Sequence, residues 1–200
     1  MKFVAKKTDD VIKKLTKAME EVQTGKRFQH TLGVAFTSAA MAMRFDVPML
    51  DAQIAGLLHD CAKCLSDEKL IKICEKNDIS MTEVERKNPY LLHGKVGAFL
   101  ANTEYEVEDQ DILNAITYHT TGRPDMSALE KIVFIADYIE PSRKVQPGLD
   151  EVRKLAFMDL DAAVIRILHD TLTYLQGKSV EIDPMTQETY EYYLKEIKEK

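Results

Sequence analysis

The sequence predicts a single all-α domain, and three observations support that prediction. Apolar residues recur every three or four positions over most of the chain, as they do on one face of an α-helix. The sequence shows no useful length of the apolar–polar alternation that marks a strand, and it contains no repeat. Its 200 residues can bury one core. We therefore expect a multi-helix bundle spanning 1–200, with its core at about 20–145 and C-terminal helices at 149–200 packed on it.

Capping residues and helix breakers separate the expected helices. Pro48 suits the first turn of a helix and not its interior, so a helix is expected to begin there. Ser66 predicts the start of a short helix, and serine followed three positions later by glutamate predicts capping boxes at Ser80 and Ser127. The helix after Ser127 stops before Pro141. The longer expected helices span residues 10–22, 26–45, 48–64, 91–103, 111–119, 149–176 and 184–200.

Composition excludes several classes of function. The net charge of −6 argues against general nucleic-acid binding, which needs a basic face, but not against a polyphosphate ligand, because metal ions can supply positive charge locally. No stretch approaches the roughly 20 apolar residues that span a bilayer. No apolar signal core follows the N-terminal lysines. We therefore expect a cytoplasmic protein that binds neither nucleic acid nor membrane.

A histidine and an aspartate stand side by side after an apolar run. Residues 52–58 are almost all apolar, His59 and Asp60 follow, and Lys63 comes three places later. Imidazole and carboxylate suit iron, manganese, zinc and similar cations. A lone pair of this kind is more often a hydrogen-bonded core histidine beside a surface acid. The pair is therefore informative only if the chain supplies further ligands.

Further candidate ligands lie along the chain. All five histidines fall in or at the ends of helical patterns: His30, His59, His93, His119 and His169. Asp137 is embedded in the apolar run 132–139, where an unpaired carboxylate would be costly and therefore requires a cation or a strong donor. His169 stands beside Asp170, but no other ligand pattern accompanies that second pair, so we expect no metal there.

The order of these residues resembles a known family. A histidine, a His–Asp pair and a later aspartate form the core pattern of the HD-domain metal-dependent phosphohydrolases, and here they are His30, His59–Asp60 and Asp137. With His93 and His119 added, the phrases His-Thr-Thr-Gly at 119–122 and Ala-Asp-Tyr-Ile-Glu-Pro-Ser-Arg at 136–143 are similar to one branch of that family. That branch is the bacterial symmetrical diadenosine tetraphosphatases, the YqeK group. The resemblance covers roughly residues 10–190.

The resemblance implies a centre of two metal ions between the helices. His30, His59, Asp60 and Asp137 would hold the first ion, and His93 and His119 would add the second, with Asp60 bridging. Paired ions can lower the pKa of a bridging water and clamp the attacked phosphate. Two divalent or trivalent ions are expected. Iron is the metal that the resemblance suggests, although nitrogen–oxygen ligation also admits manganese, cobalt or zinc.

The resemblance also implies a reaction, the symmetrical hydrolysis of a bis(5'-nucleosyl) tetraphosphate. A metal-bound hydroxide would attack an inner phosphorus of diadenosine tetraphosphate and give two ADP molecules, with Asp60 and Lys63 as catalytic residues. Lys63, Arg27, Arg123 and Arg143 are candidates to balance phosphate charge. The expected nucleotide contacts are Arg27, His93, His119, Thr120, Asp137, Arg143 and Thr186. After Thr186 the chain departs from the family, since Glu188-Thr189-Tyr190 replaces an arginine–asparagine step, and the base-binding end stays open.

Two other interpretations remain open. An HD phosphohydrolase for nucleoside monophosphates or guanosine tetraphosphate needs only the four residues of the first ion, so His93 and His119 favour the two-metal branch. A non-catalytic nucleotide sensor would retain a relict site with little metal. The helical surface also allows a homodimer, but the sequence does not locate its interface.

Overall fold

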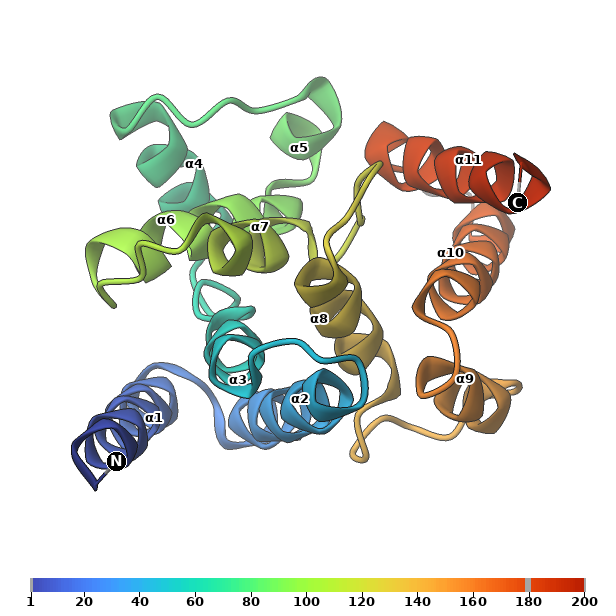
Figure 1. The fold of residues 1–200 in the computed structure, drawn as a ribbon. Helices are drawn as coiled ribbons and strands as arrows, with labels where there is room; N and C mark the ends of the chain where they lie inside the picture. Colours follow the sequence, from blue (N-terminus) through green and yellow to red (C-terminus); the bar gives the residue numbers. More distant parts are fainter. Residues whose placement is uncertain (1, 179–180, 200) are drawn as a thin grey trace.

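The fold is all-α, as the sequence predicts. The computed structural model describes residues 2–178 and 181–199, and every regular element in these ranges is a helix (Figure 1). The elements, with η1 a short 3-10 helix, are α1 (Lys2–Val22), α2 (Gly25–Arg44), α3 (Met49–Leu58), α4 (Asp67–Lys76), α5 (Glu83–Lys87), η1 (Pro89–Leu92), α6 (His93–Thr103), α7 (Gln110–Tyr118), α8 (Ala128–Ile139), α9 (Leu149–Ala156), α10 (Leu160–Gly177) and α11 (Pro184–Glu199). None of these described helices is both long and apolar enough to cross a membrane.

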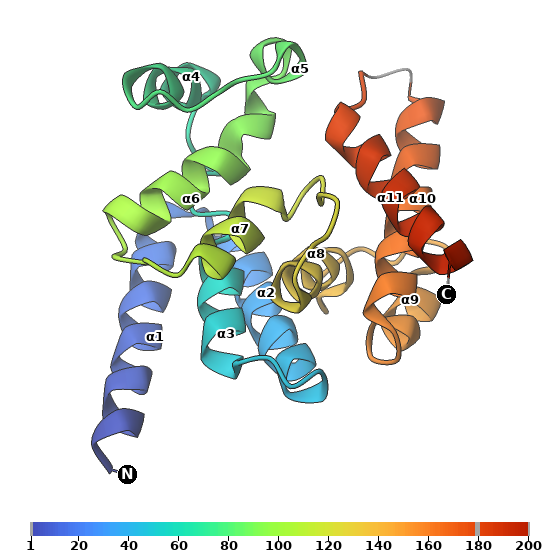
Figure 2. The ribbon, with the colours of Figure 1, turned by 45° about the horizontal axis from the view of Figure 1, so that its top comes forward.

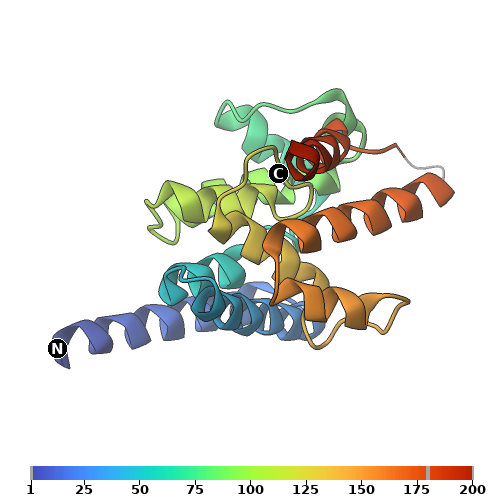
Figure 3. The ribbon, with the colours of Figure 1, turned by 45° about the vertical axis from the view of Figure 1, so that its right-hand side comes forward.

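Helix α8 is the centre of the packing. It contacts α2, α3 and α7 on one side and α9 and α10 on the other, and α11 packs on α10 (Figure 2). Its run from Ile132 to Ala136 is buried throughout, as expected for a helix that is surrounded by others. One apolar cluster continues from Leu15 of α1 through these helices to Tyr193 of α11. The amino-terminal end of α1 extends beyond the other helices (Figure 3).

A close approach of α2 and α3 holds His30 and His59 near each other. Gly56 faces the α2 backbone, and a Cβ at Gly56 would lie 2.8 Å from the Cα of Ala35. Small residues allow this contact, because helix backbones approach closely only where side chains are short. The contact holds the end of α3 against the α2 turn that carries His30.

Four boundary predictions were wrong. The helix predicted over 48–64 ends at Leu58. Residues 59–65 form turns, in which the amide of Lys63 donates to the carbonyl of Asp60, three residues back. The helix predicted over 149–176 is divided, because the Asp159 side chain caps a new helix by accepting from the amide of Ala162 at 3.0 Å. The predicted start of α6 is a separate 3-10 turn, Pro89–Leu92, and the chain is already helical from Lys2 rather than from residue 10.

One of the two capping boxes was also misplaced. The N-terminus expected at Ser80 lies at Thr82, whose hydroxyl accepts from the amide of Glu85 at 3.1 Å while Glu85 accepts from the amide of Thr82 at 2.7 Å. The box at Ser127 and Glu130 is confirmed. The pairs Ser80–Glu83 and Thr82–Glu85 have the same spacing, so the sequence allowed two starting points for α5, and the predicted one was wrong.

Candidate metal centre

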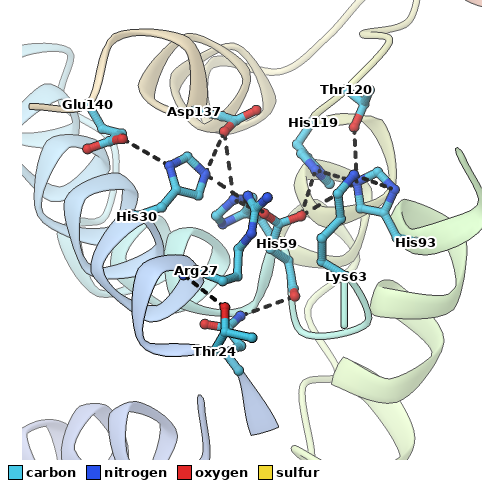
Figure 4. Close-up of polar contacts among 12 residues, drawn as sticks. Thr24, Arg27, His30, His59, Lys63, His93, His119, Thr120, Asp137 and Glu140 are labelled. Carbon is cyan, nitrogen blue, oxygen red and sulfur yellow. Dashed lines mark hydrogen bonds and ion pairs between the residues drawn. The ribbon is translucent and has the colours of Figure 1, made fainter. Parts of the chain in front are cut away.

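The six residues predicted as metal ligands meet in one place. Figure 4 shows the four histidines and Asp137 around it. His30 comes from the middle of α2, His59 and Asp60 from the turn after α3, His93 from the start of α6, His119 from the end of α7 and Asp137 from α8. All are buried except Asp137, which is partly exposed. The site therefore lies between five helices, as the sequence predicted.

Asp60 belongs to two groups of ligand atoms. His30, His59 and Asp60 form one, Asp60, His93 and His119 form the other, and the ligand atoms within each group lie within 4.8 Å of one another. The Asp60 Oδ2 atom lies 3.3 Å from His59 Nε2 and 3.8 Å from His30 Nε2. Its Oδ1 atom lies 3.5 Å from His93 Nε2 and 3.7 Å from His119 Nε2. The two oxygens of one carboxylate thus face different groups.

Asp137 extends the first group. Its Oδ1 atom lies 2.9 Å from His30 Nε2 and 3.8 Å from His59 Nε2. We call the group with His30, His59, Asp60 and Asp137 the first subsite, and the group with Asp60, His93 and His119 the second subsite.

Backbone carbonyls set the tautomer of three histidines. The Nδ1 atom of His59 lies 2.7 Å from the carbonyl of Gly56, that of His93 lies 2.6 Å from Tyr90, and that of His119 lies 2.7 Å from Ile116. Each carbonyl belongs to the residue three positions earlier. Gly56 and Ile116 lie in the last turns of α3 and α7, where carbonyl groups lack helical partners, and Tyr90 lies in η1. A carbonyl only accepts, so each Nδ1 carries the proton and each Nε2 presents a lone pair. This is the form in which histidine binds a metal.

His30 differs because a carboxylate holds it. Its Nδ1 atom lies 3.0 Å from Glu140 Oε1, and Glu140 also accepts from the amide and the hydroxyl of Ser142 at 2.6 and 2.7 Å. Burial raises the pKa of Glu140, but the bonds from His30 and Ser142 outweigh it, so the pKa lies below its ordinary value. Gly33 makes room, because a Cβ there would lie 2.4 Å from Glu140 Oε2.

Three of the inward-facing atoms have no hydrogen-bond partner in the described part of the chain. His30 Nε2, His59 Nε2 and Asp60 Oδ1 are buried and make no hydrogen bond among the described residues. His93 Nε2 and His119 Nε2 lie 3.1 Å apart, and both present lone pairs when their Nδ1 atoms carry the protons. Orphaned buried acceptors are costly, and a cation between them removes the cost. The donor set therefore fits bound metal.

Charge states match that role. Burial, then His119 and Lys63, lower the pKa of His93 to about 3, so its ring is neutral. Burial raises the pKa values of Asp60 and Asp137, but the surrounding histidines, with Arg143 beside Asp137, bring both below the ordinary value. Neutral imidazoles and ionised carboxylates are the metal-binding forms of these side chains.

Basic and polar side chains surround the subsites. Arg27 Nη1 donates to Asp60 Oδ2 at 2.7 Å, and Arg143 Nε donates to the carbonyl of Asp137 at 2.6 Å. Lys63 Nζ lies 3.2 Å from His93 Nε2, and burial lowers the pKa of Lys63. Thr120 Oγ1 lies 3.3 Å from the same nitrogen. These groups stand where an anion held by the subsites would meet them.

Other candidates lie elsewhere. Arg123, considered for phosphate charge, donates twice to Glu130 at 2.6 Å and thereby ties the loop before α8 to the α8 capping box. His169 lies on the surface, and its neighbour Asp170 accepts from Arg166 at 2.8 Å. Thr186 is buried near the start of α11, and its amide donates to the carbonyl of Asp183 at 3.0 Å.

Two cavities adjoin the centre. One, of about 190 Å³, lies beside the second subsite between Thr120, Leu91 and the α11 residues Pro184 and Met185. The other, of about 550 Å³, opens beside His30 of the first subsite. The expected contact Thr186 thus lies next to lining residues of the smaller cavity, without being one of them.

The sequence analysis gave Glu140 no role. Glu140 follows Asp137 by three residues, which places the two carboxylates on one side of α8, and it lies in the 136–143 phrase. That spacing was the available signal. The sequence analysis also gave no role to Gly33, and its position three residues after His30 was the signal available there.

Comparison with known proteins agrees with this geometry. The HD domain family model matches residues 27–142, and the chain belongs to the HD-domain family. All six residues of the centre lie within the matched range. Within the family, the chain is similar to a protein of Bacillus subtilis strain 168 named symmetrical bis(5'-nucleosyl)-tetraphosphatase, with 43% identity over 84% of this chain and 90% of the relative. A protein of the same name from Staphylococcus aureus is 34% identical over 91% and 94%. The chain thus belongs to the group formed by these relatives.

A solved structure shares the fold. It is described as a predicted HD superfamily hydrolase involved in NAD metabolism from Clostridium acetobutylicum. The two chains are 41% identical, superpose with a TM-score of 0.89, and overlap over 92% of this chain and 97% of that one.

The carboxylate behind His30 provides a first prediction. We expect Glu140→Gln to weaken metal binding about 10- to 100-fold, because an amide makes His30 a less basic ligand and cannot accept all three donors now held by Glu140. Titration of the metal-free protein with Mn²⁺ measures this effect. Glu75→Gln, an exposed position on α4, is the matched control. An unchanged affinity in Glu140→Gln would show that Glu140 does not act on the metal.

Proposed function

We propose that this protein is a metal-dependent phosphohydrolase that splits diadenosine tetraphosphate symmetrically into two ADP molecules. The observation that carries the proposal is the shared carboxylate, since Asp60 directs one oxygen to each of two histidine groups. Paired ions a short distance apart are typical of sites that clamp a phosphoryl group undergoing in-line displacement. The names of relatives at 34–43% identity and high coverage support the same substrate.

Two ions fit the donor set better than one. His30, His59, Asp60 and Asp137 would hold the first, and His93, His119 and Asp60 the second. When bound, the ions would supply positive charge to the phosphates and lower the pKa of a coordinated water. Iron remains the metal that we propose, and manganese, cobalt or zinc would satisfy the same nitrogen and oxygen donors.

The protein's own groups would position the phosphate chain. Arg27 and Arg143 can each give two parallel donors to a phosphate, and Lys63 places a positive charge beside the second subsite. Water adds to one inner phosphorus and loses a proton to the solvent, and the bond from that phosphorus to the bridging oxygen breaks. The electron pair leaves with that oxygen on the departing ADP, a stable anion that needs little acid catalysis.

The smaller cavity would hold one nucleoside. Its lining combines the apolar residues Leu91, Pro184 and Met185 with hydroxyl groups and with the charged residues Glu85, Lys95, Asp183 and Glu188. Thr120 stands between it and the second subsite. Apolar surface for a base beside polar groups for a ribose suits a nucleoside. Glu188, the first of the altered residues 188–190, lines this cavity, so we expect any difference from the family in base preference to arise here. A homodimer and a cytoplasmic location stay predictions from the sequence.

Product identity tests the function directly. We expect the metal-loaded protein to convert each diadenosine tetraphosphate into two ADP, with Asp60→Asn at least about 10³-fold slower, because loss of a bridging charge removes several kcal/mol of transition-state stabilisation. Separation of the nucleotides by ion-exchange chromatography gives the answer. Release of ATP and AMP, or turnover of nucleoside monophosphates without ADP release, would refute the proposal.

Metal content tests the two-ion arrangement. We expect two ions per chain in the wild type and about one in His119→Ala, because His119 belongs to the second subsite alone. Elemental analysis after dialysis measures the ratio. His169→Ala, on the surface, should keep both ions. A wild-type protein with a single ion, or a His119→Ala variant with two, contradicts the scheme.

A further inference from the structure

The larger cavity lies at the opposite end of the centre from the nucleoside cavity. It is lined by residues of the α2 N-terminus, by His30, and by α8 and the loop after it. Figure 4 shows the two ends, with His30 and Glu140 on one side and His93 and Thr120 on the other. Its volume of about 550 Å³ is in the range of cavities that hold a whole small ligand.

Its lining is strongly basic. Four cationic side chains face it, namely Lys26, Arg27, Arg143 and Lys144. The one carboxylate of the lining, Glu140, is already held by His30 and Ser142. The charge balance of this cavity therefore favours an anion, and the adjoining N-terminus of the long helix α2 adds to that preference.

The four cations divide into two pairs. Arg27 and Arg143 bond Asp60 and Asp137, so they belong to the centre itself. Lys26 and Lys144 are exposed and form no ion pair that the described part of the chain shows. The second pair therefore adds positive charge to the cavity that the carboxylates of the centre do not neutralise.

A symmetrical substrate would explain the additional positive charge of Lys26 and Lys144 at the larger cavity. Its cleaved bond is at the middle of the phosphate chain, so when an inner phosphorus lies at the ions, half of the molecule lies on each side of them. The nucleoside cavity beside the second subsite receives only one half. The other half carries two phosphates and a nucleoside, and the basic cavity is the space at the other end of the centre.

We propose that the basic cavity binds the second nucleoside diphosphate, the half that departs. Its phosphates would lie between Arg27 and Arg143 and the outer pair Lys26 and Lys144, and its base would meet the ring of Tyr138, which also lines the cavity. The bridging oxygen that gains the electron pair on cleavage leaves with this half, so the two arginines stabilise the charge as it forms. This assignment rests on the proposed function.

The outer lysines make the proposal testable, because neither contacts the metal ligands in any described bond. In the metal-loaded protein we expect two ADP bound per chain, and about one after Lys26→Glu with Lys144→Glu. The KM for diadenosine tetraphosphate should rise about 10- to 100-fold, as the loss of two charge-assisted contacts implies. Equilibrium dialysis with ADP and initial rates give both values, and Lys26→Met with Lys144→Met should give a smaller change in the same direction.

A matched control removes the effect of overall charge. Lys72→Glu with Lys76→Glu changes two exposed lysines of α4, away from the cavity, by the same amount, and should leave ADP binding and KM unchanged. A wild type that binds a single ADP, or a cavity variant that equals the wild type in both measurements, overturns the assignment. In the second case ADP is still released from the substrate, so the function stands while the second site falls.

Discussion

The electrostatics of one small buried volume govern this structure. The Nδ1 atoms of His59, His93 and His119 are tied to backbone carbonyls and that of His30 to Glu140, so all four rings turn their Nε2 atoms inward. The carboxylates of Asp60 and Asp137 face the same space. Lone pairs and negative charge gathered in this way repel one another; Arg27 and Arg143 offset part of that repulsion, and bound cations would offset the rest. Because ions bind the folded chain, their binding free energy adds to its stability.

The helices are arranged to supply these groups from their ends. Helix α3 ends at Leu58, and His59 and Asp60 stand in the turns that follow it, where His59 Nε2 lies 3.3 Å from Asp60 Oδ2 at one centre. His119 follows the last residue of α7 in the same way, and His93 opens α6. Gly56 brings α3 against α2, so that the ring of His30 lies 5.3 Å from that of His59.

Sequence reasoning predicted which residues meet at the centre because their chemistry is unusual in an apolar setting. Asp137 within an apolar run needs a partner wherever α8 packs, and the family order supplied the rest. The predictions that were wrong depended on individual contacts that a sequence pattern does not show. Periodicity continues through Phe157–Asp159, so the break made by the Asp159 cap was not visible, and Arg123 could be assigned only once Glu130 was seen beside it. Glu140 was missed because its role depends on a contact 110 residues away along the chain.

A symmetrical substrate does not need a symmetrical site. The two ends of this centre differ in size and charge, since the smaller cavity is lined by three carboxylates and one lysine and the larger one by four cations and one carboxylate. Identical halves bound in unlike surroundings acquire different roles, because the half among arginines is better able to accept the electron pair of the broken bond. The proposed site thus decides which of two identical halves is the leaving group. It is the half beside Arg27 and Arg143, which keeps the bridging oxygen.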